Sequence, residues 1–292
     1  MIEEGEFLRL KLDNLCVTRG KEEFIIPLED INMIIMSNLN GNITCRVLDA
    51  FTKYNIAFVV CNNQHLPSGI FTGLNSHSRV SKIFKSQIAW TEEFKNKTWK
   101  MIVYAKIKNQ RDVIKKIAGD NRQDRVQLMD ELLDNIEVGD ETNREGHAAK
   151  VYFNTIFGME FKRFEDDLTN ACLNYIYAIV RAFLARTIVA YGLSGIIGVH
   201  HKSEYDNFAL VDDLMEPFRA LCDEYVVDIL KEHQVFDFKM RHKLLDFLNE
   251  KILYKGKRMY ISSVMDVYVQ SFIKYCSSLD EQDLIFPEVI YE

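Results

Sequence analysis

The chain has 292 residues, of which 48% are hydrophobic and 27% are charged, and it contains only four prolines. This composition excludes a disordered chain and is sufficient for one large domain or two smaller ones. The formal net charge of −7 argues against a protein that binds nucleic acid over its whole surface, although it is compatible with a local basic patch.

The N-terminus and the cysteines indicate a cytoplasmic protein. The first ten residues, MIEEGEFLRL, place acids where a secretory signal has a basic region and an apolar stretch. The sequence contains no charge-free apolar run of about 18 residues, so we expect no membrane span. Its six cysteines are far apart and none has CxxC spacing, which favours reduced, buried thiols over a zinc site or a redox pair.

Residues 1–80 are predicted to form a small β-rich domain. EFLRLKL alternates between polar and apolar residues, and EEFIIPL, INMIIMS and NIAFVV are short runs of the kind found in strands. TCRVLDAFTKY has apolar residues at helical spacing. The sequence then becomes polar and basic, so we place a domain boundary near residue 80 and a linker at 81–95.

Residues 96–292 are predicted to form a larger all-α domain, which gives the chain an α+β fold class. Apolar residues recur every three or four positions from Ile88 onward. Later helices are expected over residues 145–160, 167–191, 212–232, 239–252 and 261–276. ILYKGKRMYIS predicts a hairpin that turns at Lys255-Gly256. The tail, SSLDEQDLIFPEVIYE, is either disordered or docks on a partner as an extended segment.

The first candidate site residue is Glu145, in NREGHAAKVYF. One interpretation is structural, because Asn143 can cap a helix and Glu145 can complement the positive end of the helix dipole. The other is a metal ligand beside phosphate-binding cations, for which Arg144 and Lys150 are candidates.

The second segment is GLSGIIGVHHKSEYDNFAL, which contains His200 and His201. Adjacent histidines point in different directions, so at most one of them is expected to join a given site. A single histidine in such a place is more often a hydrogen-bonded residue than a metal ligand.

The third segment is LVDDLMEPFR, where Asp212 and Asp213 both lie within one helical turn of Glu216. Acids in a first turn are favoured by the helix dipole, and Pro217 is tolerated there. Alternatively, Glu216 belongs to a metal site and Arg219 contacts a phosphate. Two carboxylates and an imidazole would suit Mg²⁺ or Mn²⁺, with Lys202 as a further phosphate contact.

NREGHAAKVYFNTIFG and GVHHKSEYDNFALVDDLMEPFR resemble the corresponding motifs of the CRISPR-associated spacer-acquisition integrases, the Cas1 family, in their type II-A form. The resemblance covers nearly the whole chain. It implies a β-rich N-terminal domain, used in dimerisation, and an α-helical domain that holds a metal site. Glu145, His201 and Glu216 match the family's catalytic metal ligands, and Asp213 matches a supporting acid.

The resemblance also implies a reaction and partners. Cas1 proteins form homodimers, and two dimers flank a Cas2 dimer. The complex joins the 3′-hydroxyl ends of a prespacer duplex to the CRISPR repeat by metal-dependent transesterification. In type II-A systems, Cas9 and an accessory protein also take part. A non-catalytic scaffold that binds DNA or Cas2 is the alternative. A zinc hydrolase is disfavoured, because the sequence has neither HExxH nor clustered histidines and cysteines.

Overall fold

A computed structural model describes residues 1–2, 7–63, 65, 67–73 and 79–289. The chain divides into two compact units. The strand-rich unit comprises Met1–Lys85 and Ala185–Leu193, and the helical unit comprises Ser86–Leu184 and Ser194–Glu292. The predicted α+β class, with strands first and helices afterwards, is confirmed.

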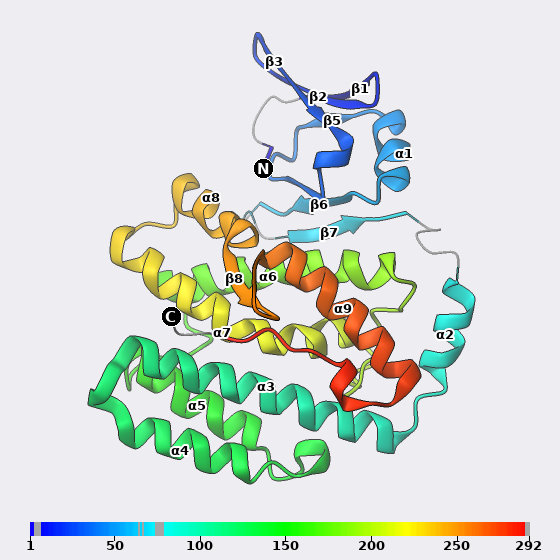
Figure 1. Cartoon of the computed structure of the whole chain (residues 1–292). Coiled ribbons are helices and arrows are strands. Elements are labelled where there is room, and N and C mark those ends of the chain that lie inside the picture. Colours follow the sequence, from blue (N-terminus) through cyan, green and yellow to red (C-terminus); the bar gives the residue numbers. More distant parts are fainter. Residues whose placement is uncertain (3–6, 64, 66, 74–78, 290–292) are drawn as a thin grey trace. The chain divides into compact units, whose positions relative to one another are not determined.

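The strand-rich unit contains two small sheets and a helix around one core (Figure 1). The first sheet has the order β3-β2-β1-β5, with bounds Glu22–Pro27, Asn14–Arg19, Phe7–Lys11 and Asn42–Ile43. The second has the order β4-β6-β7, with bounds Met33–Met36, Ala57–Cys61 and Pro67–Phe71. Helix α1 (Cys45–Lys53) contributes the fully buried Phe51 to the core that both sheets share.

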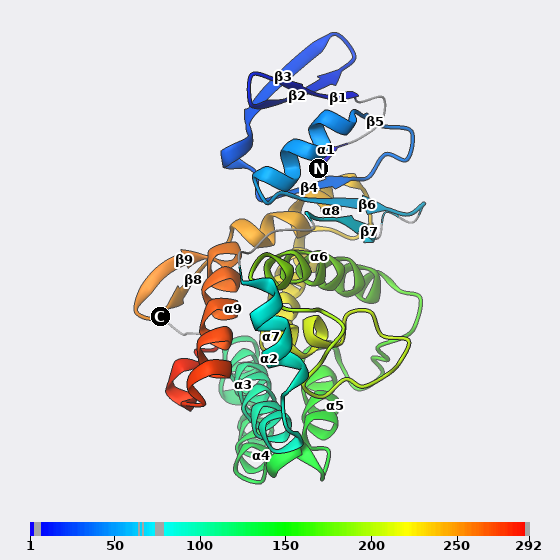
Figure 2. The ribbon, with the colours of Figure 1, turned by 90° about the vertical axis from the view of Figure 1, so that its right-hand side faces the viewer.

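The helical unit is built around the long helix α3, which packs against α4, α5 and α7 (Figures 1 and 2). The helices of the chain after α1 are α2 (Val80–Ile88), α3 (Glu92–Ala118), α4 (Gln123–Asp134), α5 (Arg144–Phe157), α6 (Leu168–Ala190), α7 (Ala209–Glu232), α8 (Phe238–Asp246) and α9 (Ile261–Ser278). The helices predicted after residue 140 are therefore confirmed in number and type along the described residues, with end shifts of three residues or fewer, except that the helix predicted over 239–252 already ends at Asp246.

Helix α3 begins and ends where its sequence dictates. The Thr91 side chain accepts a hydrogen bond from the Phe94 amide at 3.2 Å, and Glu92 and Glu93 follow in the first turn. At the other end, Gly119 adopts a φ of 54°, which a residue with a side chain reaches only with strain. Most residues of this helix between Thr98 and Ile114 are buried, as expected for the central helix of the unit.

The predicted hairpin also forms. Strand β8 (Lys251–Tyr254) pairs with β9 (Lys257–Tyr260) in antiparallel register, and Lys255 and Gly256 make the turn with φ values of 52° and 71°. Positive φ at both positions is the signature of the tight turn that matches strand twist.

Two regions differ from the sequence-based expectation. Residues 81–95, predicted as a linker, contain most of α2 and the start of α3, and their role as a linker stays a prediction. The tail, expected to be disordered or to bind a partner, instead docks on its own helical unit. Its Leu284 and Val289 are buried, and Asn109 of α3 is hydrogen-bonded to the backbone of Pro287 and Val289.

Helix α6 is long and apolar enough to cross a membrane, but 78% of its most apolar window is buried inside the protein. Buried core helices of globular proteins are commonly as long and as apolar as this helix. Its Leu173, Ile176 and Ile179 are fully buried.

Candidate functional site

Glu145 lies in the first turn of α5, but other residues cap that helix. The Asn143 side chain accepts the Gly146 amide at 3.1 Å, as predicted. The Asp140 carboxylate accepts the amides of Arg144 and Glu145 at 2.8 and 2.9 Å. Because the free amides of the helix end already have acceptors, the Glu145 carboxylate is available for another partner.

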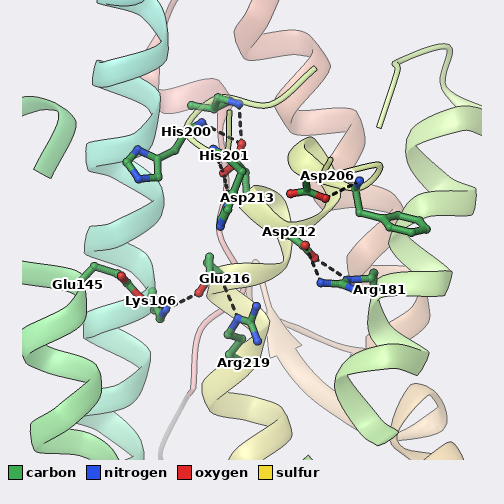
Figure 3. A network of polar contacts seen from close by, with 12 residues as sticks. Lys106, Glu145, Arg181, His200, His201, Asp206, Asp212, Asp213, Glu216 and Arg219 are labelled. Carbon is green, nitrogen blue, oxygen red and sulfur yellow. Dashed lines mark hydrogen bonds and ion pairs between the residues drawn. The ribbon is translucent and has the colours of Figure 1, made fainter. Parts of the chain in front are cut away.

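That partner is Lys106, a buried lysine in the middle of α3. Its ammonium forms ion pairs with both Glu145 and Glu216, as Figure 3 shows. The lysine side chain is only 7% exposed, whereas that of Glu145 is 28% exposed. Three helices, α3, α5 and α7, thus direct two carboxylates onto one positive charge.

Glu216 is the most buried acid of this group, with a side chain that is 6% exposed. Its Oε1 accepts a hydrogen bond from Arg219 Nε at 2.9 Å. Its Oε2 forms an ion pair with the Lys106 ammonium. Burial raises the pKa of Glu216, but Arg219 and Lys106 outweigh burial and hold it at about 2, so the group is ionised.

Lys106 and Arg219 are stabilised in their charged forms by the neighbouring carboxylates. Burial lowers the pKa of Lys106, but Glu216 and Glu145 more than compensate and raise it. Arg219 is partly buried, and its guanidinium lies 4.8 Å from the centre of the Tyr177 ring. Lys106, Arg219 and Glu216 are therefore charged, and both cations face the carboxylate of Glu216.

Asp213 organises the loop that carries the histidines. Its carboxylate accepts the amides of Val199, His200 and His201 at 2.5, 3.0 and 3.2 Å. It also lies 2.6 Å from His201 Nδ1, and this hydrogen bond raises the pKa of His201. With Nδ1 bound to a carboxylate, the Nε2 of the neutral ring carries the lone pair that can accept a proton or a metal ion.

The two adjacent histidines diverge as predicted. Their ring planes differ by 84°, and His200 stacks on Trp99 with a centroid distance of 4.1 Å. Burial lowers the pKa of His200, against the influence of Asp213. His200 is thus a packing partner of α3, and His201 is the histidine that faces the acids of α7.

The acids of LVDDLMEPFR do not act together. Asp212 turns away to Arg181, which it binds through two hydrogen bonds of 2.7 and 2.6 Å. The expectation that Pro217 lies in a first turn is wrong, because α7 already starts at Ala209 and Pro217 is inside the helix. Glu216 consequently lies in the helix interior and not at a dipole-favoured end.

The four predicted phosphate contacts differ in their surroundings. Arg219 is paired with Glu216, and Lys202 is paired with Glu92 at 2.8 Å. Lys150 is exposed on α5, and Arg144 is half-buried. Only the exposed lysines are open to a large ligand in this arrangement, and DNA binding by all four stays a prediction.

The sequence reasoning missed Lys106, Asp140 and Arg181. One signal for Lys106 was available. It occupies a position of α3 whose helical neighbours Ile102, Val103 and Val113 are fully buried, and a lysine among core positions requires a carboxylate partner. The identity of that partner, far away in the sequence, was not readable.

The residues that the structure describes contain no group of three His, Cys, Asp or Glu side chains placed to hold one metal ion. Glu145 and Glu216 do meet, with Lys106 between them, whereas His201 stays with Asp213 (Figure 3). The donor set still fits a divalent cation. It contains two carboxylates that already share a cation, and carboxylate oxygens are the ligands that Mg²⁺ and Mn²⁺ prefer.

Comparison with known proteins identifies related chains. The model of a family described as "CRISPR associated protein Cas1" matches residues 1–260. The "CRISPR-associated endonuclease Cas1" of Neisseria meningitidis serogroup C is 31% identical, over 99% of this chain and 95% of that protein. A protein of Francisella tularensis subsp. novicida, "CRISPR-associated endonuclease Cas1 1", is 23% identical over 90% of each chain.

Solved structures share the fold at low sequence identity. A casposase bound to integration product superposes with a TM-score of 0.78 and 19% identity, covering 99% of this chain and 92% of the other. A CAS1 protein from Thermotoga maritima gives a TM-score of 0.74 with 16% identity and 97% coverage of both chains. A Cas6-RT-Cas1–Cas2 complex gives 0.77 with 16% identity, covering 98% of this chain and 35% of the other.

Proposed function

The chain belongs to the Cas1 family of CRISPR-associated proteins, and we propose that it is a metal-dependent DNA integrase and endonuclease of CRISPR adaptation. In this function it joins the 3′-hydroxyl ends of a prespacer duplex to the repeat of a CRISPR array by transesterification. Membership of the family of CRISPR-associated endonucleases supports the enzyme class. The metal dependence and the individual residues are our proposal.

The observation that carries the proposal is the convergence of Glu145 and Glu216 on one cation position. We propose that both carboxylates and His201 Nε2 hold Mg²⁺ or Mn²⁺. When bound, such an ion polarises a phosphodiester and stabilises the charge on the attacking and leaving oxygens. Asp213 orients His201 through its hydrogen bond to Nδ1, and Arg219 holds Oε1 of Glu216.

The proposed partners follow from the named relatives. One solved relative is a casposase bound to integration product, and another is a Cas1–Cas2 complex. We propose that this chain binds prespacer and repeat DNA, with Arg144, Lys150, Lys202 and Arg219 as phosphate contacts. We also propose a homodimer, two of which flank a Cas2 dimer in the prokaryotic cytoplasm. Cas9 and the type II-A accessory protein are further proposed partners, together with the type II-A assignment.

The strand-rich unit offers a surface for the proposed homodimer. Strand β3 lies at the edge of its sheet, and all of its residues are exposed. Phe24, Ile25 and Ile26 are between 39% and 52% exposed there. An exposed apolar edge strand is typical of a surface that pairs with another chain.

A non-catalytic DNA-binding or scaffold subunit is the second candidate. It is favoured by the ion pairs themselves, since Lys106 and Arg219 already neutralise Glu145 and Glu216. On this hypothesis the acids only stabilise the contact between α3, α5 and α7.

A strand-transfer assay separates the two hypotheses. The purified chain, with Cas2 and a prespacer duplex, is incubated with a repeat-bearing plasmid in Mn²⁺, Mg²⁺ or EDTA. We expect joined products with the metals and none with EDTA. Glu145→Ala, His201→Ala and Glu216→Ala should each lower the yield by at least about 100-fold, the range known for loss of a group that stabilises a transition state.

Glu281→Ala is the matched control, because it removes an exposed carboxylate that is paired with Lys97 in the same unit. It should integrate like the unaltered protein. Integration by the Glu216→Ala protein at the normal rate in Mn²⁺ would contradict the proposed site. DNA binding without any joined product under all conditions would favour the scaffold.

A further inference from the structure

Lys106 has no role in the site as the sequence predicts it, yet it occupies the centre of that site. Its ammonium is buried and contacts the carboxylates of Glu145 and Glu216. Taking a charged group out of water is costly unless close opposite charges compensate. The two carboxylates therefore compensate for the burial of the Lys106 ammonium, and the ammonium compensates for the burial of the carboxylates.

The charges around Lys106 are balanced. Glu145 and Glu216 contribute two negative charges, and Lys106 and Arg219 contribute two positive ones. Arg219 occupies Oε1 of Glu216, and Lys106 is in contact with Oε2. At Glu216, a divalent ion would have to use an oxygen that already faces Lys106 or Arg219, and two adjacent cations repel each other strongly in a buried place.

We propose that Lys106 is a resident counter-ion of the metal site: it holds Glu145 and Glu216 together in the metal-free protein, and the metal ion displaces its ammonium. This inference rests on the proposed function. The displaced ammonium needs a new anion close to α3. In a protein that binds DNA at this site, the available anion is a phosphate of the nucleic acid.

The two binding events are consequently coupled. Without DNA, a metal ion has to break two ion pairs and leave the lysine without a partner, so metal binding is weak. With DNA present, the lysine exchanges its carboxylates for a phosphate, and metal binding becomes tighter. Because coupling is reciprocal, the metal also strengthens DNA binding by the same factor.

The test is the Mn²⁺ affinity of the full chain, measured from the electron paramagnetic resonance signal of free Mn²⁺. It is recorded with and without a duplex whose 3′ ends are dideoxy, so that no strand transfer occurs. Lys106→Met removes the charge and keeps the length of the side chain. We expect this variant to bind Mn²⁺ at least about tenfold more tightly than the unaltered protein in the absence of DNA.

The second measurement is the effect of DNA on the Mn²⁺ affinity. The duplex should tighten Mn²⁺ binding by the unaltered protein by about tenfold or more, and by the Lys106→Met protein by less than about threefold. Lys108→Met is the matched control, because Lys108 lies on the same helix but pairs with the exposed Glu288. It should behave like the unaltered protein in both arms. Equal or weaker Mn²⁺ binding by Lys106→Met without DNA would overturn the inference, and so would an equal effect of DNA on both proteins.

A second variant covers the case in which Lys106→Met does not fold. Lys106→Arg keeps the positive charge between the carboxylates, so it should bind Mn²⁺ no more tightly than the unaltered protein does. Tighter binding by Lys106→Arg would overturn the inference. Glu145→Gln and Glu216→Gln separate this result from the proposed function. If they keep normal Mn²⁺ affinity, the metal site itself is wrong, whereas if they lose it and Lys106→Met gains nothing, only the role of Lys106 is wrong.

Discussion

At the scale of single residues, Asp213 is the acid on which the histidine loop depends. Four donors converge on its carboxylate, namely three backbone amides and His201 Nδ1. The Asp213 side chain is fully buried, so water cannot replace a lost acceptor. The loop that presents His201 is thus held by one side chain from α7.

Asp213→Asn is expected to destabilise the protein and to release His201. The Asn side chain would place an NH₂ group, itself a donor, where a carboxylate oxygen now accepts hydrogen bonds. Buried donors would then lack acceptors, which costs about 3 kcal/mol or more. Urea unfolding measures the loss, and the nuclear magnetic resonance shift of the His201 ring reports its new tautomer. Asp228→Asn, an exposed change on the same helix, should leave both unchanged.

Gly198 makes the same loop possible. A Cβ atom at this position would lie 2.7 Å from the His201 carbonyl oxygen and 2.8 Å from Asp213 Oδ2. Neither neighbour is the far end of a flexible side chain, so the loop itself would have to move.

Gly198→Ala should therefore lower strand transfer by tenfold or more and lower the melting temperature, because His201 loses its place beside Asp213. Gly69→Ala is the control, since no atom lies within 4 Å of a Cβ added there. A Gly198→Ala protein with normal activity and stability would show that the approach of the loop to Asp213 is not required.

At the scale of elements, α7 carries a buried acid that the proposed mechanism does not use. Asp223 accepts a hydrogen bond from Tyr177, and its side chain is fully buried. Burial raises its pKa to about 6, against the lowering by Tyr177 and Arg219. The folded protein thus binds this proton more tightly than the unfolded chain, whose ordinary pKa is 3.8.

The sign of the pH effect follows from this difference. Between pH 3.8 and about 6 the folded state binds more protons, so the contribution of Asp223 to stability falls as the pH rises through this window. The total change is at most about 3 kcal/mol. Asp223→Asn should remove it, so the variant should gain stability relative to the unaltered protein between pH 4 and pH 7. Urea unfolding at both pH values measures this, and a constant difference would contradict it.

The elements themselves were largely predictable from the sequence, because apolar periodicity and turn residues act locally. The helix containing Glu145, the hairpin at Lys255-Gly256 and the separation of strands from helices all followed from such patterns. The start of α7 was predicted too late. Ala209 and Leu210 belong to a stretch that looks like a loop until its burial is known.

The site was predictable only in part. Glu145, His201 and Glu216 were identified by resemblance, and the structure brings Glu145 and Glu216 to one cation. Lys106 was not predicted as a site residue, because periodicity shows which face of a helix is buried and not which distant charge contacts it. Asp140 was not predicted either, because capping by Asn143 was already a sufficient explanation for the start of α5.

At the scale of the whole molecule, the tail is part of the folded helical unit. Asn109 of α3 donates hydrogen bonds to the carbonyls of Pro217 and Pro287 at 2.8 and 2.9 Å, and it accepts the Val289 amide at 3.2 Å. The buried side-chain amide of Asn109 therefore connects α3 with α7 and with the tail. Its contact on α7 is Pro217, the residue that follows Glu216.

A chain that ends at Ile285 should fold with reduced stability. It loses the buried Val289 and leaves Asn109 without two partners, which together cost roughly 3 kcal/mol. The melting temperature should fall by about 6–12 °C for a protein of this size. Glu288→Ala, which removes only an exposed ion pair with Lys108, should shift it by less than about 2 °C. An unchanged melting temperature of the shortened chain would show that the tail is not part of the folded unit.

Helix α6 limits how this protein can be divided into fragments. Its last residues, from Ala185 onward, belong to the strand-rich unit, although they follow that unit by a hundred positions in the chain. Within that unit, Arg186 donates a hydrogen bond to the Asn55 carbonyl at 3.0 Å and is 7% exposed. A fragment cut after residue 85 would thus lack a piece of its own structure, and an engineered N-terminal domain needs this helical segment supplied with it.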